Sequence, residues 1–228
     1  MGRSCAHRLN ANSNSTVYWL IRNIYAAGLV DKVREEIAPW ARRREADGGV
    51  EIDWQGLTNR SPLFKACYFE SLRLDSAPWS FKRLQKDASV QEEREGGAGS
   101  KGNTATAAKF QLRQGDAVLV PADLHHTDPR FFEDASAFRP ERFYVRHDSA
   151  PELRAEIKTI RPYGGGSTMC KGRILAEREV LAAVAAILVC WDLEPAPGCS
   201  WDFDERLKTS GVCKPGQDLR VRLIKRKV

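Results

Sequence analysis

The segment from Tyr163 to Arg173 constrains the fold of this chain more than any other. It reads Tyr-Gly-Gly-Gly-Ser-Thr-Met-Cys-Lys-Gly-Arg and leads into a long apolar helix expected over Lys171–Cys190. Three consecutive glycines let the backbone lie flat against a large planar ligand. We expect Cys170 at the start of the helix, where free amides and the positive dipole end favour a thiolate. A thiolate is a strong ligand of iron, so Cys170 is a candidate ligand of a haem iron.

Two other classes of glycine-rich loop are excluded by spacing. A phosphate-binding loop would end in Gly-Lys-Ser/Thr, whereas this one has Cys170-Lys171-Gly172. A cysteine phosphatase loop would carry an arginine where Ala176 stands. A catalytic thiol paired with a histidine stays open, although no histidine lies near Cys170 in the sequence. A flexible loop with a buried cysteine is the plain alternative.

A second helix of chemical interest is expected from Ser61-Pro62 to about Leu74. Ser61 is a suitable N-cap, and Pro62 suits the first helical position. The helix is apolar on nearly all sides, which predicts that it is buried. Glu70 and Arg73 are neighbours on one of its faces, and a buried charge without a partner costs several kcal/mol. We therefore expect them to pair, the alternative being a chance surface salt bridge.

A third motif reads Phe-Arg-Pro-Glu-Arg-Phe over residues 138–143. A guanidinium placed in this motif could reach Glu70 with two hydrogen bonds and complete an Arg–Glu–Arg network. The alternative is a turn between two aromatic anchors, without any further role.

The rest of the chain predicts a mainly α fold with small β-sheets. Hydrophobic patterns indicate helices over Asn14–Tyr25 and Val30–Ile37, a strand-like Gln111–Pro121, and a terminal strand in which Leu219, Val221 and Leu223 face inward. Residues 86–109 combine Gly, Ser, Ala, Thr and mixed charge without a hydrophobic period. We expect them to form an exposed insertion.

Composition excludes several broad classes. The 228 residues are 42% hydrophobic and 29% charged, which is globular and unlike a disordered chain, collagen or a coiled coil. The six cysteines are widely spaced without a Cys-x-x-Cys pair, which argues against a disulfide scaffold or a zinc ribbon. The longest apolar stretch, Val180–Trp191, is shorter than the ~20 residues that span a bilayer, and no signal peptide is recognisable. As written, the chain is expected to have no anchor of its own.

Taken together, the order and separation of the three motifs resemble the cytochrome P-450 family. The motifs are Glu-x-x-Arg, Pro-Glu-Arg-Phe and aromatic-x-x-Gly-x-x-x-Cys-x-Gly. The segment that begins at His126 resembles the one preceding Pro-Glu-Arg-Phe in that family. The resemblance implies that Cys170 is the axial ligand of haem b. It further implies roles for the following residues: Tyr163, Gly164, Gly166 and Gly172 in the haem-binding loop, Arg83 at a haem propionate, and Glu70, Arg73 and Arg142 in a structural triad.

Two departures from the family pattern suggest a branch. Asn14-Ser15 replaces the usual acidic residue and threonine of the long helix that crosses the distal haem face. Thr168 replaces a common Arg or His two positions before the cysteine. Both departures, and the tail from Asp204 to Leu223, are similar to the sterol 7α-hydroxylase and prostacyclin synthase branch, in a microbial, fungal-type member. In the family this tail forms a terminal hairpin, and the tip of the hairpin borders the substrate pocket.

The resemblance extends over residues 1–228 but covers only the C-terminal half of the family, from the central distal helix onward. It implies that the membrane anchor and most substrate-recognition loops belong to a part not present here. A full-length member would lie at the endoplasmic reticulum membrane. The location of this chain as written is unknown or cytoplasmic.

The implied reaction is insertion of one oxygen atom from dioxygen into a lipophilic, sterol-like or fatty-acid-derived substrate. An NADPH-dependent reductase would supply electrons, meeting Lys171 and Arg173 through an acidic surface. Asn14 cannot shuttle a proton as a carboxylate can, but Ser15 could order a water.

Three alternatives stay open. One is a haem-thiolate isomerase of the prostacyclin synthase type, and another is an inactive truncated remnant. The third is a basic binding module formed by the final strand, but its charges are better explained as a solvated face, so we expect no nucleic-acid partner. The basic residues concerned are Arg220, Arg222, Lys225, Arg226 and Lys227.

Overall fold

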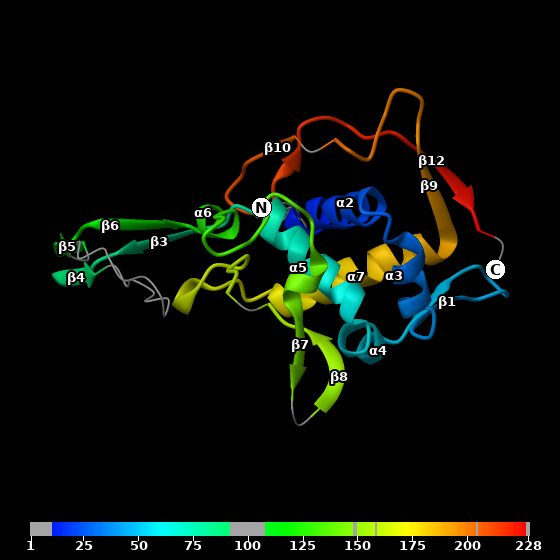
Figure 1. Ribbon diagram of the computed structural model, residues 1–228, viewed down its shortest axis with the longest axis horizontal. Helices are drawn as coiled ribbons and strands as arrows, with labels where there is room; N and C mark the ends of the chain where they lie inside the picture. The colour runs from blue at the N-terminus through cyan, green and yellow to red at the C-terminus, as the bar shows by residue number, and fades with distance from the viewer. Residues whose placement is uncertain (1–10, 92–107, 148–149, 158, 204, 227–228) are drawn as a thin grey trace, which may run out of the picture. The chain divides into compact units, whose positions relative to one another are not determined.

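The computed structural model describes residues 11–91, 108–147, 150–157, 159–203 and 205–226 (Figure 1). The chain divides into two compact units, one made of residues 1–78 and 121–228 and the other of Trp79–Val120. The described part combines helices with small two-stranded sheets, as the sequence predicts.

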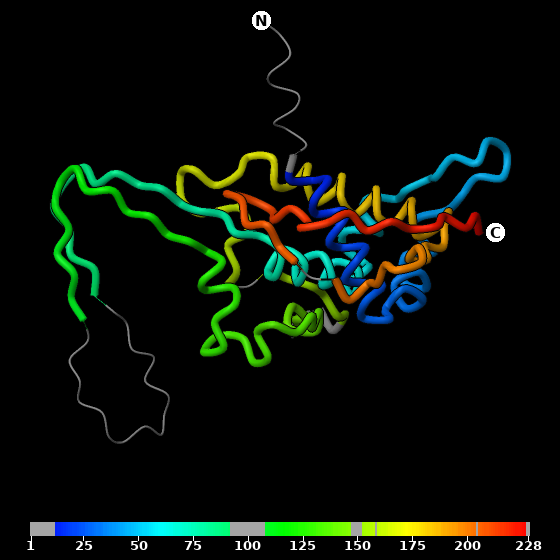
Figure 2. The backbone as a smooth tube through the Cα atoms, turned by 90° about the horizontal axis from the view of Figure 1, so that it is seen from above, coloured from blue at the N-terminus to red at the C-terminus, as the bar shows by residue number. Residues whose placement is uncertain are grey.

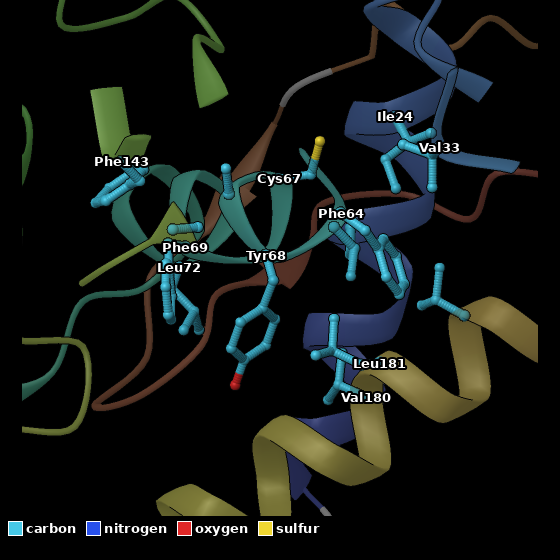
Figure 3. Packing of buried hydrophobic residues seen from close by; sticks show 14 of the residues in the cluster. Ile24, Val33, Phe64, Cys67, Tyr68, Phe69, Leu72, Phe143, Val180 and Leu181 are labelled. Atoms are coloured by element: carbon cyan, nitrogen blue, oxygen red, sulfur yellow. The ribbon is translucent and has the colours of Figure 1, made fainter. Parts of the chain in front are cut away.

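Three helices form the centre of the first unit: α2 (Ala11–Ala26), α5 (Pro62–Asp75) and α7 (Arg173–Cys190). Shorter helices α3 (Val30–Ile37) and α4 (Trp54–Asn59) pack beside them. Figure 3 shows side chains from α2, α3, α5 and α7 meeting in one apolar core. Each large side chain buried there contributes about 1.5–3 kcal/mol to stability. The fully buried members include Trp19, Leu20, Ile24, Val33, Phe64 and Leu181.

The beginning of α5 is capped differently from the expectation. Pro62 takes the first helical position, but the Ser61 side chain makes no capping hydrogen bond. Instead, the carboxylate of Glu36 in α3 accepts hydrogen bonds from the amides of Leu63 at 2.9 Å and Phe64 at 2.8 Å. Burial raises the pKa of Glu36, and these two amides act in the opposite direction. Ser61 is the N-cap residue, as predicted, but its side chain does not cap the helix, because the longer side chain of Glu36 satisfies the same free amides.

The terminal strand β12 (Val221–Lys225) pairs antiparallel with β9 (Trp191–Pro195), which follows α7 directly. Ile224 is half-buried, whereas Leu223 is 56% exposed. The predicted inward position of Leu223 was therefore wrong. Although Leu223 lies opposite the buried Leu193 in the register, β9 is the sole strand partner of β12 in the described part, which leaves the outer side of Leu223 to solvent.

The remaining elements of the first unit are short. They comprise three hairpins and three single-turn helices, of which α6 and η1 contribute to the candidate site. They are β1 (Ala41–Arg43) with β2 (Val50–Ile52), β7 (Tyr144–His147) with β8 (Ala150–Ala155), β10 (Arg206–Leu207) with β11 (Lys214–Pro215), α6 (Ala122–His126), and the 3-10 helices η1 (Pro140–Phe143) and η2 (Gly166–Thr168).

In the second unit the chain runs out along β3 (Trp79–Arg83) and β4 (Ala88–Gln91) and returns along β5 (Lys109–Leu112) and β6 (Ala117–Pro121) (Figure 2). β3 pairs with β6, and β4 pairs with β5. The predicted turn is present, with Gly115 at a φ of 90°. The exposed insertion predicted over 86–109 falls mostly on residues outside the described ones and stays a prediction.

No helix among the described residues is both long enough and apolar enough to cross a membrane.

Candidate functional site

The structure places Glu70 and Arg73 side by side on α5, both with fully buried side chains. Arg73 donates from Nε to Glu70 Oε2 and from Nη2 to Glu70 Oε1, both at 2.7 Å. This two-point geometry is the strong form of an arginine–carboxylate pair. Because the pair lies away from water, its charges depend on hydrogen bonds from the rest of the fold.

The other N–H groups of Arg73 are used by backbone carbonyls. Nη1 donates to the carbonyls of His126 at 2.6 Å and Ala135 at 2.7 Å, and Nη2 donates to that of Ala137 at 3.2 Å. An arginine has five N–H donors, and all five have acceptors here. These carbonyls could not be predicted from sequence, because every residue carries one.

Arg142 reaches the same carboxylate from η1. Its Nε lies 3.3 Å from Glu70 Oε1, and its side chain is 13% exposed. The backbone N–H of Arg139 donates to the same oxygen at 2.9 Å. The structure therefore brings together the three residues Glu70, Arg73 and Arg142, and adds an amide that the motif did not indicate.

The glycine-rich loop closes on itself through backbone hydrogen bonds. The N–H of Cys170 donates to the carbonyl of Tyr163 at 3.0 Å, and the N–H of Gly164 donates to that of Arg161 at 3.0 Å. Gly164 and Gly166 have φ values of 71° and 66°, in the left-handed region that glycine tolerates best. The loop thus needs glycine at these two positions.

Cys170 is exposed and forms no disulfide with another cysteine of the described residues. The expectation that it opens the long helix was wrong, because α7 begins at Arg173 and its N-cap is Gly172. The free amides of the first helical turn therefore follow the cysteine by several residues. A Cβ at Gly172 would lie 3.9 Å from Cys170 Sγ, so this glycine lies beside the sulfur.

Tyr163 is anchored to α5 by its side chain. Its hydroxyl and that of Tyr68 lie 2.5 Å apart, a hydrogen bond between two phenols. Burial is the main cause that raises the pKa of each hydroxyl. Sequence reasoning missed Tyr68, whose only signal was its place on the same helix as Glu70 and Arg73.

His126 is a second residue that sequence reasoning did not assign. Its side chain is fully buried, and its Nε2 accepts a hydrogen bond from the backbone N–H of Arg161 at 2.9 Å. Burial is the main cause that lowers the pKa of His126 to about 4, helped by His125 and Arg73. The ring is therefore neutral at physiological pH.

The other predicted site residues lie apart from these contacts or remain unplaced relative to them. Asn14 is exposed and Ser15 is half-buried on α2. Their neighbour Ser13 donates to Glu179 Oε2 of α7 at 2.9 Å. Arg83 is exposed at the end of β3 in the second unit. The roles predicted for Asn14, Ser15 and Arg83 stay predictions.

The residues of the loop fit a haem. A porphyrin supplies four nitrogen ligands itself, so the protein has to offer only one strong axial ligand. Cys170 is an exposed thiol on a glycine-rich loop, which suits such a ligand. In the described part of the chain, no group of three or more His, Cys, Asp or Glu residues could hold a metal ion alone.

Comparison with known proteins decides the family. The family model described as Cytochrome P-450 matches residues 100–220, just over half of the chain. The chain belongs to the cytochrome P-450 family. The match contains both the Pro-Glu-Arg-Phe motif and the loop of Cys170.

Individual cytochromes P-450 match over a larger share of the chain. A cytochrome P-450 monooxygenase of Gibberella zeae is 26% identical over 96% of this chain and 42% of its own length. Another of Eupenicillium brefeldianum is 38% identical over 63% of this chain and 27% of its own length. A crystal structure of a cytochrome P-450 superposes with a TM-score of 0.65 at 26% identity, covering 95% of this chain and 43% of that one. The chain thus spans less than half the length of these relatives.

Proposed function

We propose that this chain carries the haem-thiolate half of a cytochrome P-450 monooxygenase, with Cys170 as the axial ligand of haem b. The observation that carries the proposal is an exposed thiol on a loop with two left-handed glycines. That loop lies against the helix with the buried Glu70–Arg73 pair, to which the Tyr68–Tyr163 hydrogen bond joins it.

The bound haem would supply reductive activation of dioxygen, a chemistry that a thiolate ligand promotes. The chain's own residues would hold and orient it. Cys170 would provide the thiolate, and Gly164, Gly166 and Gly172 would leave room for the porphyrin beside the loop. Tyr163 would fix the loop to α5, and Glu70, Arg73 and Arg142 would keep that helix in place.

Two residues of α2 bear on how protons would be delivered and on which branch of the family the chain resembles. Ser15 would order a water, whereas the Asn14 amide cannot carry a proton as a carboxylate does. This substitution favours, as a second candidate, an isomerase of the prostacyclin synthase type that rearranges its substrate without dioxygen. A single test separates the two: substrate turnover under argon would persist for the isomerase and stop for the monooxygenase.

The proposed substrate is small and lipophilic, sterol-like or derived from a fatty acid, and the proposed electron donor is an NADPH-dependent reductase. A groove of about 800 Å³ lies beside the loop, and its lining is mainly apolar with charges of both signs, since Lys65 pairs with Glu177 there at 3.0 Å. The reductase would instead meet Lys171 and Arg173 next to Cys170, where their positive charge would attract an acidic partner surface. The family resemblance supports the endoplasmic reticulum membrane as the location of a full-length member.

The experiment is a hemin titration of the purified 228-residue chain, followed by reduction and addition of CO. We expect saturable binding and the red-shifted Soret band of a thiolate-ligated haem. Cys170→Ala should lose that band. A chain that folds but takes up no hemin would be the inactive remnant, and would contradict the proposal for this chain.

A further inference from the structure

We propose that His126 is a positioning residue of the haem-binding loop: its neutral ring accepts a hydrogen bond that holds the loop entrance, while its backbone carbonyl holds Arg73. The haem part of this inference rests on the proposed function. The part that concerns the loop itself does not.

Arg161 stands at the entrance of the loop. Its N–H donates to His126 Nε2 at 2.9 Å, and its carbonyl accepts the N–H of Gly164 at 3.0 Å. Both backbone groups of Arg161 are thus used immediately before the glycines. Tyr163, two residues further, accepts the N–H of Cys170. A shift of Arg161 would therefore move both ends of the loop that presents the thiol.

His126 also contacts the buried ion pair. The carbonyl of His126 accepts from Arg73 Nη1 at 2.6 Å, one of the five hydrogen bonds of that guanidinium. His126 ends α6, so its ring and its carbonyl are fixed by the same short helix. One residue thereby connects the Glu70–Arg73 pair to the loop entrance through two direct hydrogen bonds.

This geometry requires a neutral His126 ring. Because Nε2 accepts an N–H, the single ring proton of neutral histidine must be on Nδ1. A second proton would convert Nε2 into a donor aimed at another N–H, and the hydrogen bond would be lost. Nδ1 is buried without a hydrogen-bond partner in the described part of the chain, so no hydrogen-bond acceptor stabilises a charged ring there.

The charged groups around His126 are mixed. His125, Arg73 and Arg161 disfavour a second proton, whereas Asp123 favours it, and desolvation by burial outweighs each of them. Asp123 itself pairs with Lys208 at 2.7 Å, which weakens its influence. Together these influences keep the His126 ring neutral down to about pH 4. An exposed histidine would instead take up its proton near pH 6.5.

Amide-resolved hydrogen exchange of the full chain without haem tests the proposal. We expect His126→Leu to raise the exchange rate of the Arg161 amide up to about tenfold, because the amide loses its acceptor. His126→Gln keeps an acceptor at similar reach and should restore most of the protection. His125→Gln is the matched control and should leave the Arg161 amide unchanged. An unchanged rate in His126→Leu would overturn the proposal.

The pH dependence gives a test that needs no variant to fold. After correction for the intrinsic exchange rate, protection of the Arg161 amide in the wild-type chain should persist from about pH 8 to about pH 5. Loss of protection between about pH 7 and 6 would show an ordinary histidine and refute the assignment.

A haem readout separates this inference from the proposed function. In hemin-loaded protein, His126→Leu should decrease the thiolate-type Soret band of the reduced CO complex, and His126→Gln should recover it. If the wild-type chain binds no hemin, the proposed function fails for this chain. Amide exchange would still decide whether His126 positions the loop.

Discussion

The Glu70–Arg73 pair lies on α5, and the Cys170 loop is joined to the same helix by the Tyr68–Tyr163 hydrogen bond. The two regions are nevertheless stabilised in different ways. The pair is fully buried, and every N–H of Arg73 has an acceptor within the described chain. The loop is shaped by backbone hydrogen bonds and left-handed glycines, is tied to its surroundings through Tyr68 and His126, and carries an exposed cysteine. The difference indicates that the pair serves the stability of the fold, whereas the loop leaves its cysteine exposed.

The largest effect is expected from breaking the pair. Arg73→Ala leaves Glu70 as a buried charge without its main partner, which should lower the free energy of unfolding by about 3–5 kcal/mol. Denaturant unfolding followed by circular dichroism measures this loss. The matched control is Arg139→Ala, since its side chain is 44% exposed and only its backbone amide reaches Glu70. Equal losses in the two variants would show that the buried pair has no special role.

A slightly smaller effect should appear on acidification. Unfolded His126 takes up a proton near pH 6.5, whereas the folded residue does so at about 4. Between these values the unfolded state binds more protons, so stability falls as pH is lowered, by about 3 kcal/mol over the window. Denaturation at a series of pH values should show this dependence in the wild type and a weaker one in His126→Gln. Identical slopes in both proteins would contradict it.

The loop should respond to single methyl groups in a position-dependent way. Gly164→Ala forces a side chain into the left-handed region and should cost about 1–2 kcal/mol. Gly165→Ala is the control, because Gly165 is extended at a φ of −153° and a Cβ there meets no atom within 4 Å. Thermal unfolding and hemin uptake of the two variants can be compared directly. A larger loss in Gly165→Ala would mean that the loop is held differently.

Sequence predicted the motifs better than the contacts that complete them. Hydrophobic patterns and proline placed the main helices to within a few residues, because a buried helical face requires regular apolar positions. The Glu70–Arg73 contact followed from spacing on α5. The cap from Glu36 and the hydrogen bond from Arg161 to His126 did not, because they join segments far apart in sequence through groups without a distinctive pattern.

The smallest effect on the fold, and the largest on the chemistry, is expected at Cys170. Since its side chain is exposed, Cys170→Ala should change the free energy of unfolding by no more than about 0.5 kcal/mol. The same variant removes the proposed axial ligand. Cys170→Ala should therefore lose haem ligation but keep its stability, whereas Arg73→Ala should lose both.

The spectrum of the reduced, CO-bound chain after loading with hemin tests the central claim most directly. We predict a thiolate-type Soret band in the wild type and its absence in an equally stable Cys170→Ala variant. An unchanged band in that variant, or a folded wild-type chain without haem absorbance, would contradict the assignment of Cys170 as the haem ligand.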